Sequence, residues 1–326
     1  MRKPSPSIAE HPVGAGRRSL RSRFAPLLPH VPPRTLFVLA FALFTLAVVT
    51  VPTAACAALA AAVPAALLGH ALRRRRRRNR SGASAATAQR VLLRPLPGRI
   101  GDLRLRGTYL PARTATRSGG DLYDAVRSPY GARLLIGDVR AKGMLAVEAS
   151  AVLLRAFRAA AYEEETLTGV ARRLEDDARR HIATLPGTET PERFATALLV
   201  EIPAGQVARV VHCGHPEPLL VSGGRVGACP PERPGAPIGM ADLVGAGHTV
   251  QTLPFRAGER LVLCTDGFTE ARDAAGRFHP FAERLGARAA EPLDDLVDGL
   301  RADLLRHTGG APADDAALLV VERDPG

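Results

Sequence analysis

Four aspartates between residues 121 and 314 constrain the fold of this 326-residue chain more than any other feature. Asp138 and Asp266 each follow an apolar run that predicts the end of a buried strand. Asp121 follows a pair of glycines, and Asp314 precedes another apolar run. Carboxylates at strand ends tend to share a cleft, where each pair about 5 Å apart costs about 3 kcal/mol at an effective dielectric constant of about 20. We therefore expect a cleft in which protonation or a bound cation relieves this repulsion.

The residue types in this cleft indicate which cation and which reaction it serves. Aspartate-rich sites with few histidines suit Mg²⁺ or Mn²⁺ better than Zn²⁺, which prefers Cys and His. Two such ions about 3.5–4 Å apart clamp a transferring phosphoryl group and lower the pKa of a bridging water. The aspartates thus predict phosphate-ester hydrolysis. Each aspartate taken singly could instead cap a turn or a helix, and only the ordered set favours the cleft.

The positive charge of the chain is concentrated at its N-terminal end. The net charge is +12, but residues 1–90 carry +14 and residues 91–326 carry −2. A nucleic-acid footprint would need a basic patch on the folded part, so we expect no nucleic-acid partner. The four cysteines form no C-x-x-C pair, which favours the cytosol as the compartment of the folded part.

The N-terminal third of the chain predicts three segments before the folded domain. Residues 1–34 are polar and rich in Pro and Arg, which is typical of a disordered cytoplasmic tail. Residues 35–70 are almost wholly apolar and long enough for a transmembrane helical hairpin that turns at Val51-Pro52-Thr53. A single tilted span or a re-entrant loop is the alternative. Residues 71–90 form a basic juxtamembrane linker.

Arginines on both sides of the apolar segment predict that both termini lie in the cytoplasm. The sequence therefore predicts a multi-pass protein of the cell membrane whose catalytic domain is cytoplasmic. The same arginines could also bind anionic lipid headgroups.

Residues 91–326 predict one α+β domain, because hairpin strands alternate with inserted helices. The helices are expected over residues 144–162, 167–178 and 293–304. The strands are expected over residues 133–137, 194–202, 206–213, 219–221, 225–226, 261–264 and 316–321.

Seven segments of this domain, in order, resemble the PPM family of metal-dependent protein Ser/Thr phosphatases (type 2C), in its bacterial SpoIIE-like branch. They are SGGDLYD (118–124), IGDVRAKG (136–143), FATALLVEI (194–202), CGHPEPLLV (213–221), APIGM (236–240), LVLCTDGFTEARD (261–273) and DDAALLVV (314–321). The resemblance implies an antiparallel β-sandwich flanked by helices, with two Mn²⁺ or Mg²⁺ ions at one edge.

The resemblance also implies roles for the aspartates, all four of which are present. Asp138 should bridge both metals, with the backbone carbonyl of Val139 as a further ligand. Asp266 and Asp314 should bind one metal, and Asp121 the other, partly through water. The nucleophile would be the bridging water.

Residues around these ligands are further candidates. Asp124 and Asp315 are expected to support the metal ligands from behind. Arg140 stands where many eukaryotic members have a histidine that is thought to protonate the leaving group, so no general acid is assigned. The phosphate-binding candidates are Arg113, Arg117 and Arg140.

His212 and His215 are spaced like a metal-binding pair. Only these two histidines lie close in the sequence, however, and CGHPEPLL is typical of a strand end followed by a turn. We therefore expect no zinc site here.

The resemblance predicts a membrane-anchored phosphatase that acts on phosphoserine or phosphothreonine of a protein. A common substrate in this branch is a phosphorylated anti-anti-sigma factor with a STAS domain. The alternative is a catalytically weak or inactive docking module of the same fold, tethered to the membrane. A homodimer built on the helices of residues 144–184 is a further hypothesis.

Overall fold

The computed structural model describes residues 32–50, 64, 66–71, 85–113, 120–141, 143–184, 194–241, 245 and 247–325. The chain divides into two compact units, Met1–Ala71 and Leu72–Gly326. Each unit is described by itself below.

The described part of the first unit is helical. Helix α1 spans Pro33–Thr50, and residues 64 and 66–71 are also helical. Large apolar side chains of α1 are exposed, such as Phe37 at 70% and Leu43 at 65%. No helix within the described ranges is long and apolar enough to cross a membrane, so the two predicted transmembrane helices are not supported. The expected turn at Val51-Pro52-Thr53 lies outside the described residues, as do the linker arginines Arg73–Arg78 and Arg80.

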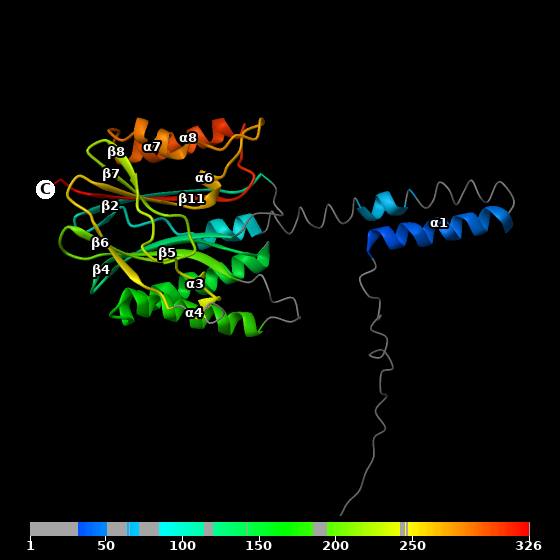
Figure 1. The fold of residues 1–326 in the computed structure, drawn as a ribbon, viewed down its shortest axis with the longest axis horizontal. Coiled ribbons are helices and arrows are strands. Elements are labelled where there is room, and N and C mark those ends of the chain that lie inside the picture. The colour runs from blue at the N-terminus through cyan, green and yellow to red at the C-terminus, as the bar shows by residue number, and fades with distance from the viewer. Residues whose placement is uncertain are drawn as a thin grey trace, which may run out of the picture. The chain divides into compact units, whose positions relative to one another are not determined.

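Two antiparallel sheets form the centre of the second unit (Figure 1). The first sheet has the strand order β1 (Arg99–Ile100), β2 (Leu103–Leu110), β11 (Ala316–Arg323), β10 (Arg260–Cys264), β7 (Leu219–Ser222) and β8 (Arg225–Ala228). The second sheet has the order β3 (Asp121–Ser128), β4 (Gly131–Val139), β5 (Ala195–Ile202), β6 (Val207–Cys213) and β9 (Val250–Pro254).

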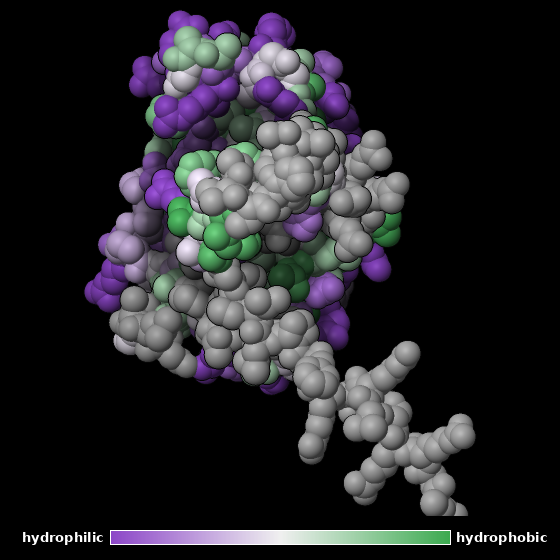
Figure 2. All heavy atoms as spheres, turned by 90° about the vertical axis from the view of Figure 1, so that its right-hand side faces the viewer, coloured by the Kyte–Doolittle hydropathy of each residue, from purple (hydrophilic) through white to green (hydrophobic). Residues whose placement is uncertain are grey.

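Helices cover the outer face of each sheet, which makes four layers (Figure 1). Helices α3 (Met144–Glu163) and α4 (Leu167–Thr184) pack on the second sheet. Helices α6 (Asp266–Thr269), α7 (Phe281–Ala287) and α8 (Leu293–His307) pack on the first. Hydrophilic side chains cover the outside of the α7–α8 layer (Figure 2). The predicted α+β architecture with antiparallel sheets is confirmed.

The central strands are mostly apolar because both of their faces are buried. In β10, Leu261 and Leu263 face the core between the sheets, whereas Val262 and Cys264 face α7 and α8. This double burial is why the runs before Asp266 and after Asp315 contain almost no polar residue. It also places the ends of these strands, where the first polar residues stand, at one edge of the sandwich.

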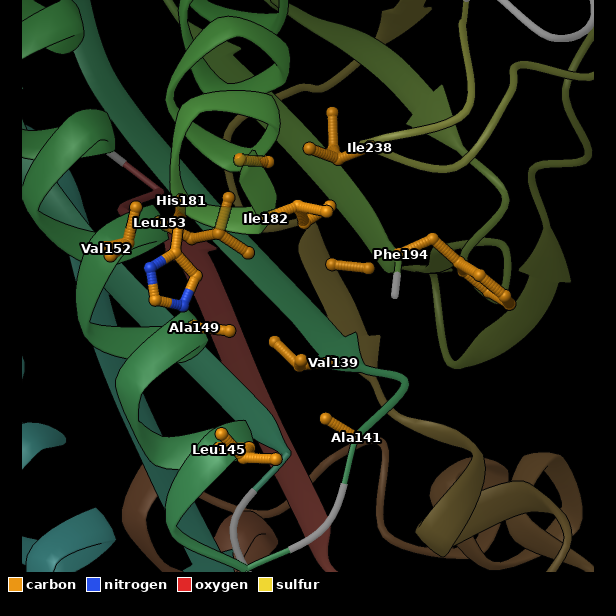
Figure 3. Close-up of a pocket in the computed structure, with 12 residues that line it drawn as sticks. Val139, Ala141, Leu145, Ala149, Val152, Leu153, His181, Ile182, Phe194 and Ile238 are labelled. Carbon is orange, nitrogen blue, oxygen red and sulfur yellow. The ribbon is translucent and has the colours of Figure 1, made fainter. Parts of the chain in front are cut away.

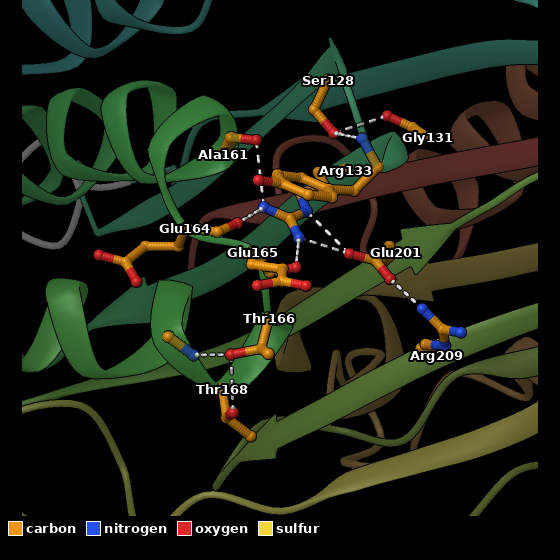
Figure 4. A network of polar contacts seen from close by, with 12 residues as sticks. Ser128, Gly131, Arg133, Ala161, Glu164, Glu165, Thr166, Thr168, Glu201 and Arg209 are labelled. Atoms are coloured by element: carbon orange, nitrogen blue, oxygen red, sulfur yellow. Dashed lines mark hydrogen bonds and ion pairs between the residues drawn. The ribbon is translucent and has the colours of Figure 1, made fainter.

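A buried arginine fixes the α3–α4 corner to the second sheet (Figure 4). Arg133 of β4 is fully buried and forms an ion pair with Glu201 of β5 at 2.6 Å. Its guanidinium also donates to the backbone carbonyls that end α3, those of Ala161, Glu164 and Glu165. The guanidinium donors of Arg133 thereby satisfy the Glu201 carboxylate and these three backbone carbonyls.

Candidate metal centre

The second sheet brings two of the predicted aspartates directly together. Asp121 begins β3 and Asp138 stands one residue before the end of β4, and the register pairs them. Residues that are directly opposite in an antiparallel pair have Cβ atoms about 4.5–5.5 Å apart and project to the same face. Their carboxylates therefore share one side of the sheet edge.

The first sheet contributes the other two aspartates to the same edge. Asp266 begins α6 directly after β10, and Asp314 stands two residues before β11, the neighbour of β10. Thr265 joins the two sheets, because its hydroxyl donates to Asp121 Oδ2 at 2.7 Å. The same hydroxyl accepts from the backbone N–H of Ala317 at 2.9 Å. The structure thus gathers all four predicted aspartates at one edge.

Gly120 lies against the predicted bridging carboxylate. A Cβ at this position would stand 2.3 Å from Asp138 Oδ1 and 3.0 Å from the backbone oxygen of Val139. Both oxygens therefore converge on the space beside Gly120, which no other residue type would leave open. Ser150 of α3 donates to the Gly120 carbonyl at 3.2 Å and holds this glycine in place.

The Asp315 carboxylate holds Gly120 by its backbone. It accepts from the backbone N–H of Ala112 at 2.8 Å and from that of Gly120 at 3.3 Å. It therefore ties the segment before β3 to the segment before β11. Asp315, which was expected to support the metal ligands, therefore contacts the glycine that lies against Asp138.

The other predicted supporting residue lies elsewhere. Asp124 is three residues along β3 from Asp121, so it projects to the opposite face of the strand. There it forms an ion pair with Arg158 of α3 at 2.5 Å. It helps attach α3 to the sheet and does not contact the cluster.

Three carboxylates of the cluster, those of Asp121, Asp138 and Asp266, resist ionisation in the absence of a cation. Burial, followed by the charges of Asp266 and Asp314, raises the pKa of Asp138 to about 7, against the opposing effect of Arg140. Burial, followed by the charges of Asp138 and Asp315, raises the pKa of Asp121 well above its ordinary value. Burial, followed by the charge of Asp314, raises the pKa of Asp266. A hard divalent cation would reverse this penalty, so the donor set fits Mg²⁺ or Mn²⁺.

Side chains alone do not complete a coordination shell here. Within the described ranges, no group of three or more His, Cys, Asp or Glu side chains is arranged so that it could hold a metal ion. Mg²⁺ usually keeps several waters and takes only one or two carboxylates from the protein. Asp138 Oδ1 and the Val139 carbonyl, which converge beside Gly120, are the donors that best fit such an ion.

The predicted phosphate-binding arginines separate into different environments. Arg140 directly follows Val139 and is exposed, and its charge opposes the raised pKa values of Asp138 and Asp266. Arg113 donates to the backbone carbonyls of Ala311 and Thr308, both at 3.1 Å, and so holds the connection between α8 and β11. Arg117 lies outside the described residues.

Three residues of the site were not predicted from the sequence. They are Thr265 and Ser150, described above, and Gln89, which is fully buried and donates through Nε2 to the backbone carbonyl of Asp121. Gln89 lies in a helical segment, residues 85–92, within the stretch interpreted as linker. Its signal was one glutamine in a stretch of mostly small residues, which composition alone does not single out.

An apolar pocket lies behind Val139 (Figure 3). It has a volume of about 60 Å³ and is bounded by α3, α4 and the strand ends that carry Val139 and Ala195. Leu145 and Ile182 point into it, and Phe194 also lines it (Figure 3).

Comparisons with known proteins point to one family. The model of the family described as "Stage II sporulation protein E (SpoIIE)" matches residues 128–324. This range includes Asp138, Asp266 and Asp314 and begins just after Asp121.

Solved structures share the fold. The SiaA-PP2C domain of Pseudomonas aeruginosa is 20% identical with a TM-score of 0.61, covering 76% of this chain and 98% of that one. The RsbU and RsbW domains of Rv1364c from Mycobacterium tuberculosis are 26% identical with a TM-score of 0.56, and the match covers 68% of this chain and 60% of that one. The PP2C phosphatase domain of SpoIIE from Bacillus subtilis, with a fragment of its regulatory domain, is 15% identical with a TM-score of 0.54, covering 68% and 63%.

One curated protein also matches over a short stretch. The match spans 99 residues at 40% identity, and the matched protein is a phosphoribosyl imidazole-4-carboxamide isomerase from Parafrankia sp. (strain EAN1pec). It covers 28% of this chain and 39% of the isomerase. The chain thus spans well under half of that isomerase, and this match assigns no activity.

Proposed function

Since the chain belongs to the SpoIIE family and its second unit is a PP2C-type serine/threonine phosphatase domain, we propose that it hydrolyses phosphoserine or phosphothreonine on a protein. One observation carries this proposal. Asp121 and Asp138 of the second sheet meet Asp266 and Asp314 of the first at a single edge, joined by the hydrogen bond from Thr265.

The residues that would hold the metal are those that the resemblance assigned. Asp138 and the Val139 carbonyl would hold the ions together with Asp121 for one of them and with Asp266 and Asp314 for the other. When bound, two Mn²⁺ or Mg²⁺ ions would neutralise the phosphoryl oxygens and supply an activated water at neutral pH.

The chain itself positions these groups and contacts the phosphate. Thr265 holds the Asp121 carboxylate, and Asp315 holds Gly120 so that the space beside Asp138 stays open. Arg140 presents guanidinium donors beside the cluster, where they can bind phosphate oxygens in a bidentate manner. No described histidine takes the place of the acid that Arg140 replaces.

A phosphorylated STAS-domain anti-anti-sigma factor is the substrate that we propose. Two findings support it: the family match and the likeness to a Mycobacterium tuberculosis protein that carries an RsbU domain together with an RsbW domain. Incubation of the chain with such a phosphoprotein, followed by phosphate release and intact mass, tests the assignment.

We also propose that residues 35–70 attach the protein to the cell membrane, with the phosphatase domain in the cytoplasm. The exposed apolar side chains of α1 and the arginines that flank the segment support this. Release of the protein from membranes by alkaline carbonate would contradict it, whereas release only by detergent is the expected result.

The activity is tested with the full chain, because Gln89 precedes the predicted domain boundary and contacts Asp121. Mn²⁺-dependent hydrolysis of p-nitrophenyl phosphate and of a phosphoprotein is expected, and Asp138→Asn and Asp266→Asn should abolish it. Asp295→Asn, on the exposed face of α8, is the matched control and should retain it. Partner binding without any Mn²⁺-dependent turnover would favour the docking alternative.

A further inference from the structure

His215 is a buried histidine that the proposed chemistry does not use. It lies between β6 and β7, is 8% exposed, and follows Gly214, whose φ of 68° favours glycine. A Cβ on Gly214 would stand 2.9 Å from Pro237 Cγ, and a parallel bridge joins Gly214 to Ala197 of β5. The backbone therefore holds the His215 ring at a fixed place against the second sheet.

The ring contacts a residue directly beside the predicted bridging aspartate. His215 Nδ1 and Thr196 Oγ1 are 3.0 Å apart. Thr196 of β5 is directly opposite Asp138 of β4 in the sheet register. Because directly paired residues project to the same face, Thr196 shares the face on which Asp138 meets the other carboxylates. One side chain thus separates His215 from Asp138.

The other side of the ring faces the first sheet. The backbone of Cys264, the last residue of β10, is close enough to favour protonation of His215. Nε2 is buried and has no hydrogen-bond partner of regular geometry in the part of the chain that the structure describes. Cys264 precedes Asp266 by two residues. The imidazole therefore stands between the strand pair that carries Asp138 and the strand end that carries Asp266.

The buried environment of the His215 ring determines its protonation state and its chemical role. Burial lowers the pKa of His215 to about 3, despite the nearby Cys264 backbone, so the ring is neutral at physiological pH. A neutral, enclosed imidazole does not deliver a proton to a leaving group, and His215 is not the acid that Arg140 replaces. It can, however, form a lasting hydrogen bond with a hydroxyl.

We propose that His215 is a positioning residue of the metal centre: through Thr196 it sets the place of the β4–β5 edge, and so of Asp138, relative to Asp266. Its effect on the metal rests on the proposed function. Partners that orient metal ligands from behind typically change metal affinity by about 10–100-fold when they are removed.

The test measures Mn²⁺ affinity on the full chain, by direct titration and by the Mn²⁺ dependence of p-nitrophenyl phosphate hydrolysis. Thr196→Val removes the hydroxyl with little change of shape, and His215→Leu removes the ring nitrogens. Each is expected to weaken Mn²⁺ binding by about tenfold or more. Thr196→Ser, and His215→Asn with its amide near the position of Nδ1, should stay close to wild type.

The matched control is His212→Leu. His212 is buried in the same segment, and neither ring nitrogen has a hydrogen-bond partner among the described residues. It should therefore keep wild-type Mn²⁺ affinity.

Three results would overturn the proposal: wild-type Mn²⁺ affinity in folded Thr196→Val, equal losses in Thr196→Val and Thr196→Ser, or an equal loss in His212→Leu. If the wild type binds Mn²⁺ but hydrolyses nothing, the proposed function fails, and direct titration of the variants still decides the role of His215. Thr196→Val keeps the test decisive if His215→Leu does not fold.

Discussion

The hydroxyl of Thr265 donates a hydrogen bond of 2.7 Å to Asp121, and this contact joins a carboxylate of the second sheet to the first. The donor lowers the pKa of Asp121, in opposition to burial and the neighbouring charges. The same oxygen accepts from the N–H of Ala317. One side chain thus fixes the relative position of the two sheet edges that carry the candidate metal ligands.

Thr265→Val should impair the site more than Thr265→Ser. Valine leaves Asp121 and the Ala317 N–H without their partner in a buried place, which costs about 1–3 kcal/mol of stability per unsatisfied group. We expect a loss of Mn²⁺ affinity of about tenfold or more, together with lower thermal stability. Serine keeps the hydroxyl and should retain most of both. Equal behaviour of the two variants in Mn²⁺ titration and thermal unfolding would show that the hydroxyl is dispensable.

Gly120→Ala should abolish phosphatase activity while the fold persists. Its Cβ would fall 2.3 Å from Asp138 Oδ1, so the carboxylate must move from its place beside the Val139 carbonyl. Gly227→Ala is the matched control, because a Cβ there meets nothing within 4 Å. Circular dichroism should show both variants folded, and only the first should lose Mn²⁺-dependent turnover. Wild-type turnover in Gly120→Ala would mean that this space is not used.

Arg133→Met should destabilise the α3–α4 corner. The change removes the buried one of the two arginine partners of Glu201 and the donor to three backbone carbonyls, and breaking a buried ion pair typically costs about 3–5 kcal/mol. Arg209 also pairs with Glu201 but is half-exposed, so Arg209→Met should cost no more than about 1 kcal/mol. Urea unfolding measures both. A similar free energy of unfolding in the two variants would contradict the structural role given to Arg133.

The sequence predicted the strands and helices that have strong apolar runs better than it predicted which strands pair with each other. Strands β5 and β11 lie close to their expected positions because both faces are buried, and α8 follows its apolar spacing. Strand β2 was not predicted, although Leu103 and Leu105 alternate with arginines as in a half-buried strand. Individual strands were thus visible as patterns, but not the sheet order that joins them.

The same limit applies to the site. Motif order identified Asp121 and Asp138, but the register that makes them direct neighbours depends on how β3 pairs with β4. Thr265 and Ser150 were missed because their roles depend on contacts with segments more than 25 residues away. Asp124 was expected to support the metal ligands from behind, and strand alternation turns it toward Arg158.

Without metal, the protein should lose stability as the pH rises toward 8. The folded-state pKa of Asp138 is about 7, above its ordinary value of 3.8, so the folded state binds the proton more tightly than the unfolded state. The resulting stabilisation is complete below about pH 4 and is lost as the pH rises through about 7. The asparagine of Asp138→Asn cannot ionise, so this variant should not lose that stabilisation as the pH rises. Its free energy of unfolding relative to wild type should therefore increase between pH 5.5 and pH 8 by on the order of 2 kcal/mol. Urea unfolding in EDTA at the two pH values measures the difference.

Mn²⁺ should restore the stability of the wild type at pH 8, because a bound cation favours the ionised carboxylate. It should raise the stability of Asp138→Asn much less. Parallel pH profiles of the two proteins in EDTA would contradict the buried-charge account of this edge.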